Sequence, residues 1–94
     1  MRIQVVRSGG FAGLRRERAV ETEQLPPGER ADLERLVAES RFFDLPVRAT
    51  SGAPDVIQYR VKVEVEGRGH EITADDQTLG DALRKLATRV LAGE

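Results

Sequence analysis

Apolar and polar side chains alternate without a defect along Ile57-Gln58-Tyr59-Arg60-Val61-Lys62-Val63-Glu64-Val65-Glu66. Successive side chains of an extended chain point to opposite faces, so this pattern predicts a strand with one buried and one solvated face. Gly67-Arg68-Gly69 then turns the chain into a shorter strand, residues 70–74, which completes a hairpin. This hairpin is the clearest element of the predicted fold.

A helix is predicted on each side of this hairpin. The one that follows carries a single apolar stripe at helical spacing, made of Leu79, Ala82, Leu83, Leu86, Val90 and Leu91. We expect Asp75 or Asp76 to cap it, because a short acidic side chain accepts hydrogen bonds from the first amides of a helix.

The earlier helix begins at Pro26-Pro27, since proline suits the first helical turn. Its apolar stripe is Leu33, Leu36 and Val37. Phe42-Phe43-Asp44-Leu45-Pro46 closes the helix, with at least one phenylalanine in the core and Pro46 preventing continuation. Residues 47–54 are expected to form a flexible loop.

A second hairpin is predicted at the N-terminus. Met1 to Arg7 alternates as a strand does, and the more polar residues 14–22 return beside it, close to an edge of the sheet. The order of elements is therefore β-β-α-β-β-α. This order predicts an α+β fold, with a four-stranded antiparallel sheet, both helices on one face, and residues 1–94 in one domain.

Composition excludes several classes of function. Charged residues make up 33% of the chain but nearly cancel to a net charge of −1, whereas proteins that bind nucleic acids usually carry a basic excess. There is no cysteine, so neither disulfides nor thiolate chemistry are available. The charged N-terminus does not resemble a signal peptide, and no apolar run is long enough to span a membrane. We therefore expect a cytoplasmic protein without a membrane partner.

Catalysis, metal binding and cofactor binding are not expected. His70 is the only histidine, and its neighbour Glu71 points to the opposite face of the strand. Asp75-Asp76 lacks the spaced oxygen ligands of a calcium loop. The glycines between residues 9 and 13 match neither the dinucleotide fingerprint nor the P-loop. The protein is therefore predicted not to be an enzyme.

The loop of the first hairpin is the most unusual feature, because it places Phe11 between glycines in Arg7-Ser8-Gly9-Gly10-Phe11-Ala12-Gly13. Glycine allows the sharp turn. The phenylalanine must either fold back onto the core or be held out for a partner, and the pattern leaves both readings open. Arg15, Arg16 and Arg18 follow, and we interpret them as part of a solvated hairpin with cross-strand charge pairs.

Five segments together resemble the emfourin family of bacterial inhibitors of thermolysin-like zinc metalloproteases. They are residues 7–13 above, Leu25-Pro26-Pro27, Leu33-Glu34-Arg35-Leu36-Val37, Phe42-Phe43-Asp44-Leu45-Pro46 and Pro54-Asp55-Val56-Ile57-Gln58-Tyr59. The resemblance covers nearly the whole chain in the same order, and the Arg-Ser-Gly-Gly-Phe stretch is its most specific part.

The resemblance implies a cytoplasmic inhibitor of protealysin-type enzymes of the M4 family, with no zinc ligand supplied by the inhibitor. It directs attention to Arg7, Ser8, Gly9, Gly10, Phe11, Ala12 and Gly13 as the protease-binding residues, with Phe11 in an apolar pocket beside the zinc. The 47–55 loop is a second candidate contact. The alternative is an interaction module without inhibitory activity that uses the open sheet face or an edge strand. A monomer is favoured.

Overall fold

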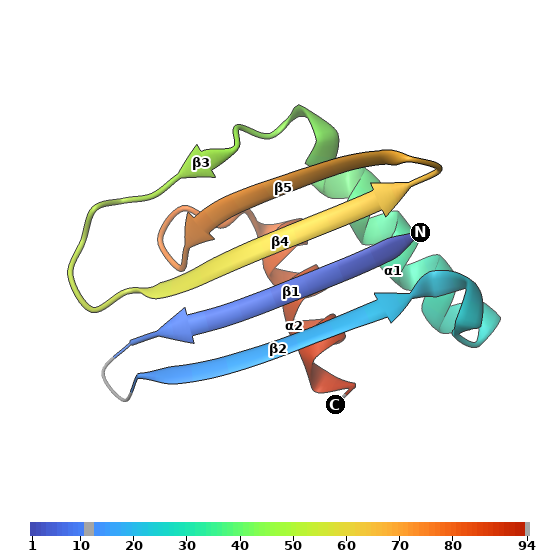
Figure 1. Ribbon diagram of the computed structural model, residues 1–94, viewed down its shortest axis with the longest axis horizontal. Coiled ribbons are helices and arrows are strands. Elements are labelled where there is room, and N and C mark those ends of the chain that lie inside the picture. The colour runs from blue at the N-terminus through green and yellow to red at the C-terminus, as the bar shows by residue number, and fades with distance from the viewer. Residues whose placement is uncertain (11–12, 94) are drawn as a thin grey trace.

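The computed structural model describes residues 1–10 and 13–93. A sheet forms one layer and two α-helices cover one of its faces, as Figure 1 shows. The strands are β1 (Arg2–Gly9), β2 (Leu14–Glu21), β3 (Arg48–Ala49), β4 (Ile57–Val65) and β5 (Arg68–Asp75), and the helices are α1 (Pro27–Ser40) and α2 (Asp81–Ala92). Two short 3-10 helices, Thr22–Gln24 and Phe42–Asp44, flank α1. The α+β class, both hairpins and both helices are thus confirmed.

The sheet has five strands in the order β2-β1-β4-β5-β3, so the prediction of four antiparallel strands is incomplete. The additional strand, β3, runs parallel to β5, with Arg48 opposite Thr73 and Ala49 opposite Ala74. A hydrogen bond of 2.8 Å from the Thr73 amide to the Val47 carbonyl begins this pairing. Two residues are too few to show a periodic pattern, and their pairing depends on a strand far away in the sequence.

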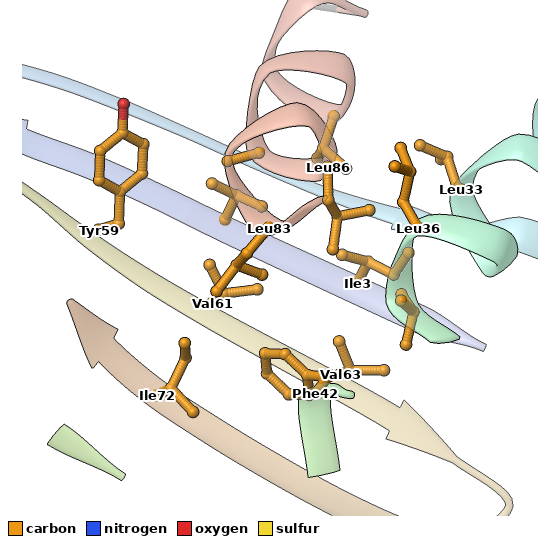
Figure 2. Close-up of a cluster of buried hydrophobic side chains, with 14 of the residues drawn as sticks. Ile3, Leu33, Leu36, Phe42, Tyr59, Val61, Val63, Ile72, Leu83 and Leu86 are labelled. Atoms are coloured by element: carbon orange, nitrogen blue, oxygen red, sulfur yellow. The ribbon is translucent and has the colours of Figure 1, made fainter. Parts of the chain in front are cut away.

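The core lies between the sheet and the helices (Figure 2). Inward-facing residues of the central strands, among them Ile3, Val5 and Val61, are fully buried. Leu83 and Leu86 of α2 pack against them (Figure 2). Phe42 is 1% exposed and enters the core from the 3-10 helix after α1, which ends where Arg41 adopts a left-handed conformation. The predicted burial of at least one phenylalanine is confirmed.

Two arginines of β2 are only partly exposed and bind the end of a helix, contrary to our interpretation of the first hairpin as solvated. Arg16 and Arg18 face the helix layer and donate hydrogen bonds of 2.9 Å to the carbonyls of Leu91 and Val90 at the end of α2. Unpaired carbonyls and the negative end of the helix dipole attract such cations. The predicted cross-strand charge pairing is present on the other face of the hairpin, where Arg2 pairs with Glu21 at 3.0 Å.

Candidate functional site

The predicted binding residues lie at one end of the sheet. Arg7, Ser8 and Gly9 are the last residues of β1, and Gly10 and Gly13 bound the loop that leads to β2. Phe11 and Ala12 lie outside the described residues. We call residues 7–14 the hairpin end.

The end of β1 is held from both sides, because β1 is an inner strand of the sheet and lies between β2 and β4. Gly9, its last residue, is opposite Leu14 of β2 and Ile57 of β4. A hydrogen bond of 3.3 Å from the Gly13 amide to the Gly10 carbonyl joins the two sides of the loop. The base of the loop is therefore anchored to three strands rather than to an isolated ribbon.

Gly9 is required for this geometry. Its φ angle is +92°, and a Cβ atom added there would lie 3.2 Å from the Val56 carbonyl oxygen. Gly13 also has a positive φ, of +63°, but no atom would lie within 4 Å of an added Cβ. Both glycines thus have a positive φ angle, which disfavours a side chain. Of the two, Gly9 alone also lies close to the backbone of another loop.

Replacement of Gly9 by alanine is expected to destabilise the protein by about 2 kcal/mol, because backbone strain and the contact with Val56 add. Gly13→Ala is the matched control, and its backbone strain alone should cost about 1 kcal/mol. The free energy of unfolding, measured by urea titration, distinguishes the two. Equal losses would show that the approach to Val56 does not restrict position 9.

A second loop, residues 50–56, lies at the same end of the sheet as the hairpin end (Figure 1). It joins β3 to β4 and reaches the hairpin end where Val56 and Ile57 approach Gly9 and Gly10. Gly52 and Asp55 have positive φ angles of 75° and 59°, as expected for a tightly bent segment. The two segments predicted as candidate contacts, residues 7–13 and the 47–55 loop, therefore approach each other in the structure.

The buried carboxylate of Asp75 holds this second loop in place. Its Oδ2 atom accepts hydrogen bonds from the amide and the hydroxyl of Ser51, at 2.6 and 2.8 Å, and its Oδ1 atom accepts one from the Gln77 amide at 2.9 Å. The Ser51 amide is the main reason why the pKa of Asp75 lies below its ordinary value, and the Ser51 hydroxyl and the Gln77 amide act in the same direction. Burial of the side chain opposes this shift.

The prediction that Asp75 or Asp76 caps the last helix is wrong. α2 begins at Asp81, and the residue in the capping position is Gly80, which makes no side-chain hydrogen bond. Asp75 still forms a turn with the amides that follow it, but its main partner is Ser51 of a distant loop. Local sequence could not separate these two uses of the same side chain.

Leu14 is a further candidate for the site, and it was not among the residues predicted from the sequence. It is 66% exposed at the start of an otherwise polar strand, immediately after the loop that contains Phe11. Leu14 also lines a hollow of about 130 Å³ on the helix side of the hairpin end, together with Arg7, Gly9, Arg16 and Ile57. The sequence shows only a leucine directly after Gly13, and its exposure in the structure adds an apolar residue to the surface of the hairpin end.

The open face of the sheet is polar. Strand alternation places Gln4, Glu17, Arg60 and Lys62 on it. Of the apolar residues on this face, Val6 is only 5% exposed and Ala19 is a small exposed side chain opposite Gln4. The alternative, an interaction module that uses the open sheet face, would be favoured by a hydrophobic patch here, and among residues 1–10 and 13–93 no large hydrophobic side chain is exposed on this face.

His70 has a structural role. Its Nε2 atom donates a hydrogen bond to the Leu45 carbonyl at 2.8 Å, and its ring packs edge-on against Phe42 at 5.5 Å between centroids. In the part of the chain that the structure describes, no three acidic, cysteine or histidine side chains come together to hold a metal ion. The same part contains no helix long and apolar enough to cross a membrane.

The family model for Emfourin matches residues 5–91 of the 94-residue chain, and so includes the hairpin end and loop 50–56. The chain belongs to the Emfourin family. This confirms the resemblance inferred from the five segments and supports a role as a protease inhibitor. Membership of an inhibitor family is also in keeping with a protein that is not an enzyme. No curated protein and no solved structure matches the chain.

Proposed function

We propose that this member of the Emfourin family inhibits thermolysin-like zinc metalloproteases of the M4 family, of the protealysin type, by placing its hairpin end in the active-site cleft. The family match to residues 5–91 is the observation that carries the proposal, because it includes every residue of the hairpin end. In this mechanism Phe11 occupies an apolar pocket beside the zinc, and the rest of the domain blocks the approach of substrate.

The way in which the sheet holds the hairpin end supports this mechanism. Pairing of β1 with both β2 and β4 continues as far as Gly9, so the described backbone that leads into the loop is held on both sides. A segment that is ordered before binding loses little conformational entropy when it docks, and this favours tight association. Loop 50–56, held by Asp75, offers a second contact beside it.

The surface of the hairpin end combines apolar and cationic groups. Leu14 is exposed next to the loop, and Arg7 lines the same hollow. Arg15 is 60% exposed, in a loose ion pair of 3.6 Å with Glu17. We assign Leu14 to the contact area, and Arg7 and Arg15 to the rim, where charges mainly raise the rate of association.

Titration of a thermolysin-like protease with the purified domain tests the proposed function. We expect peptide hydrolysis to fall to a low plateau as the domain is added. Excess zinc should not restore activity, since the proposed mechanism is obstruction of the cleft and not removal of the metal. Carboxypeptidase A, a zinc protease of another fold, is the control and should keep its activity. Full activity of every thermolysin-like enzyme tested would refute the proposal.

We further propose that the protein acts in the bacterial cytoplasm, where it restrains its partner protease. Fractionation of the producing cells, with detection of the domain by antibody, tests this location. Recovery of the protein mainly outside the cytoplasmic fraction would contradict it.

A further inference from the structure

Three arginines lack any partner within the described chain. Of the fifteen lysine and arginine residues, Arg7, Arg48 and Arg60 are those whose side chains make no hydrogen bond, ion pair or ring contact with residues 1–10 or 13–93. The others are paired even where they are strongly exposed, as Arg35 is with Asp32 and Glu39. Arg7 belongs to the hairpin end, and the other two lie beside it on the open face of the sheet.

The register of the sheet places Arg48 and Arg60 on either side of one residue. Thr73 of β5 is opposite Arg48 of β3 and also opposite Arg60 of β4. Residues in register across neighbouring strands share a face, and neighbouring strands lie about 4.8 Å apart. The two arginine Cα atoms are therefore about 10 Å apart, a distance at which two long side chains can converge on one group.

Both arginines line the same hollow, of about 260 Å³. The other lining residues include Val6, Ser8, Gln58 and Thr73. Val6 is nearly buried, while the serine and threonine hydroxyls and the glutamine amide offer hydrogen-bond donors. Ser8 is the residue before Gly9 in β1, so the hollow adjoins the hairpin end directly.

We propose that this hollow receives an acidic side chain of the partner protease, bound between Arg48 and Arg60. This inference rests on the proposed function, because the partner that meets the hairpin end would lie over Ser8 as well. Two guanidinium groups without counter-ions on one face repel each other, and a carboxylate between them removes that repulsion and accepts charge-assisted hydrogen bonds. The geometry thus points to a carboxylate as the group bound between the two arginines.

A single carboxylate suits this surface better than a nucleic acid. The flanking positions of the open face carry Glu17, Glu64 and Glu71, and Glu71 forms no ion pair with any described residue. A phosphate backbone would bring several negative charges against these acids. One acidic side chain enters only the hollow and avoids repulsion by the three glutamates.

The proposal is tested by measuring association and dissociation rates with a thermolysin-like protease that the domain inhibits. The double variant Arg48→Gln and Arg60→Gln should associate about tenfold more slowly than the parent at low salt, with a weaker dependence on ionic strength. Arg35→Gln with Arg89→Gln is the matched control, since it removes the same two charges from exposed ion pairs on the helices. The control should differ from the parent less than twofold, and equal behaviour of the two double variants would overturn the inference while the proposed function stands.

A second measurement decides the case in which no protease is inhibited. The acetylated and amidated peptide Glu-Glu-Glu is titrated into the isotopically labelled parent domain and followed by amide NMR, with Gln-Gln-Gln as the uncharged control. We expect shifts at Ser8, Gln58 and Thr73 that the double variant loses. Such shifts without inhibition would refute the proposed function alone and retain a carboxylate site. Shifts scattered over the surface, or larger shifts at these amides with a short DNA duplex, would overturn the carboxylate assignment.

Discussion

Phe11→Ala is expected to weaken inhibition of a thermolysin-like protease by about 100-fold, which corresponds to about 2.7 kcal/mol of binding free energy. Large aromatic side chains that enter a partner's pocket carry much of the energy of an interface, and truncation of such an anchor commonly costs 2 kcal/mol or more. Phe11 lies outside the described residues, so this expectation rests on its position between glycines and on the anchored strands that lead to it.

Inhibition constants for the parent and the variant, measured with thermal unfolding curves for both, check this prediction. Arg35→Ala is the control, because Arg35 is an exposed residue of α1, at 59%, and belongs to neither candidate contact loop. The control should inhibit within about twofold of the parent, as surface truncations outside an interface usually do. If Phe11→Ala inhibits as strongly as the parent with an unchanged unfolding midpoint, Phe11 is not the anchor.

Asp75→Asn is expected to reduce stability more than Gly9→Ala does. The carboxylate accepts hydrogen bonds from both Ser51 groups and from the Gln77 amide inside the protein. An asparagine side chain presents a donor where one carboxylate oxygen was, so at least one of these partly buried donors loses its acceptor, and the asparagine amide itself is buried without a partner. We also expect faster amide exchange at residues 50–56, because Asp75 joins this loop to β5.

The contribution of Asp75 should depend on pH in a defined direction. Its pKa is lowered in the folded protein, so the unfolded chain binds the proton more readily. The stabilisation is therefore complete above the ordinary aspartate pKa, at about pH 5 and higher, and is lost as the pH falls through the lowered pKa.

Comparison with the variant isolates this contribution, since the pKa values of Glu23 and Glu34 are also lowered and affect the parent at acid pH. The difference in unfolding free energy between the parent and Asp75→Asn should shrink between about pH 5 and pH 2. Asp76→Asn is the control, because the Asp76 side chain accepts no hydrogen bond from a described residue and its buried Oδ1 atom has no partner. A difference that stays constant with pH would show that the charge of Asp75 is not what holds the loop.

The long periodic elements were predictable because their signal is local. β4 alternates over nine residues, and α2 carries a continuous apolar stripe. β3 was missed because it is two residues long and is specified by β5. The positions of Arg16 and Arg18 were predicted wrongly for a similar reason, since their acceptors at the end of α2 are more than seventy residues away.

The candidate site, too, was predictable from the sequence only in part. Sequence alone drew attention to residues 7–13, through a phenylalanine among glycines and a family resemblance that the match to residues 5–91 confirms. Whether those residues bind a protease stays a prediction. Only the three-dimensional structure showed that loop 50–56 lies beside these residues and that Leu14 is exposed.

The sequence by itself determined the α+β class, both hairpins, both helices and the family, because periodicity and local motifs depend on neighbouring residues. The tertiary structure alone decided that Asp75 holds Ser51 instead of capping α2, and that Arg48 and Arg60 share one hollow beside the hairpin end. Strand order and register bring together groups that are distant along the chain. No pattern within a short window of sequence carries that information, because these contacts arise only when distant strands pair in the sheet.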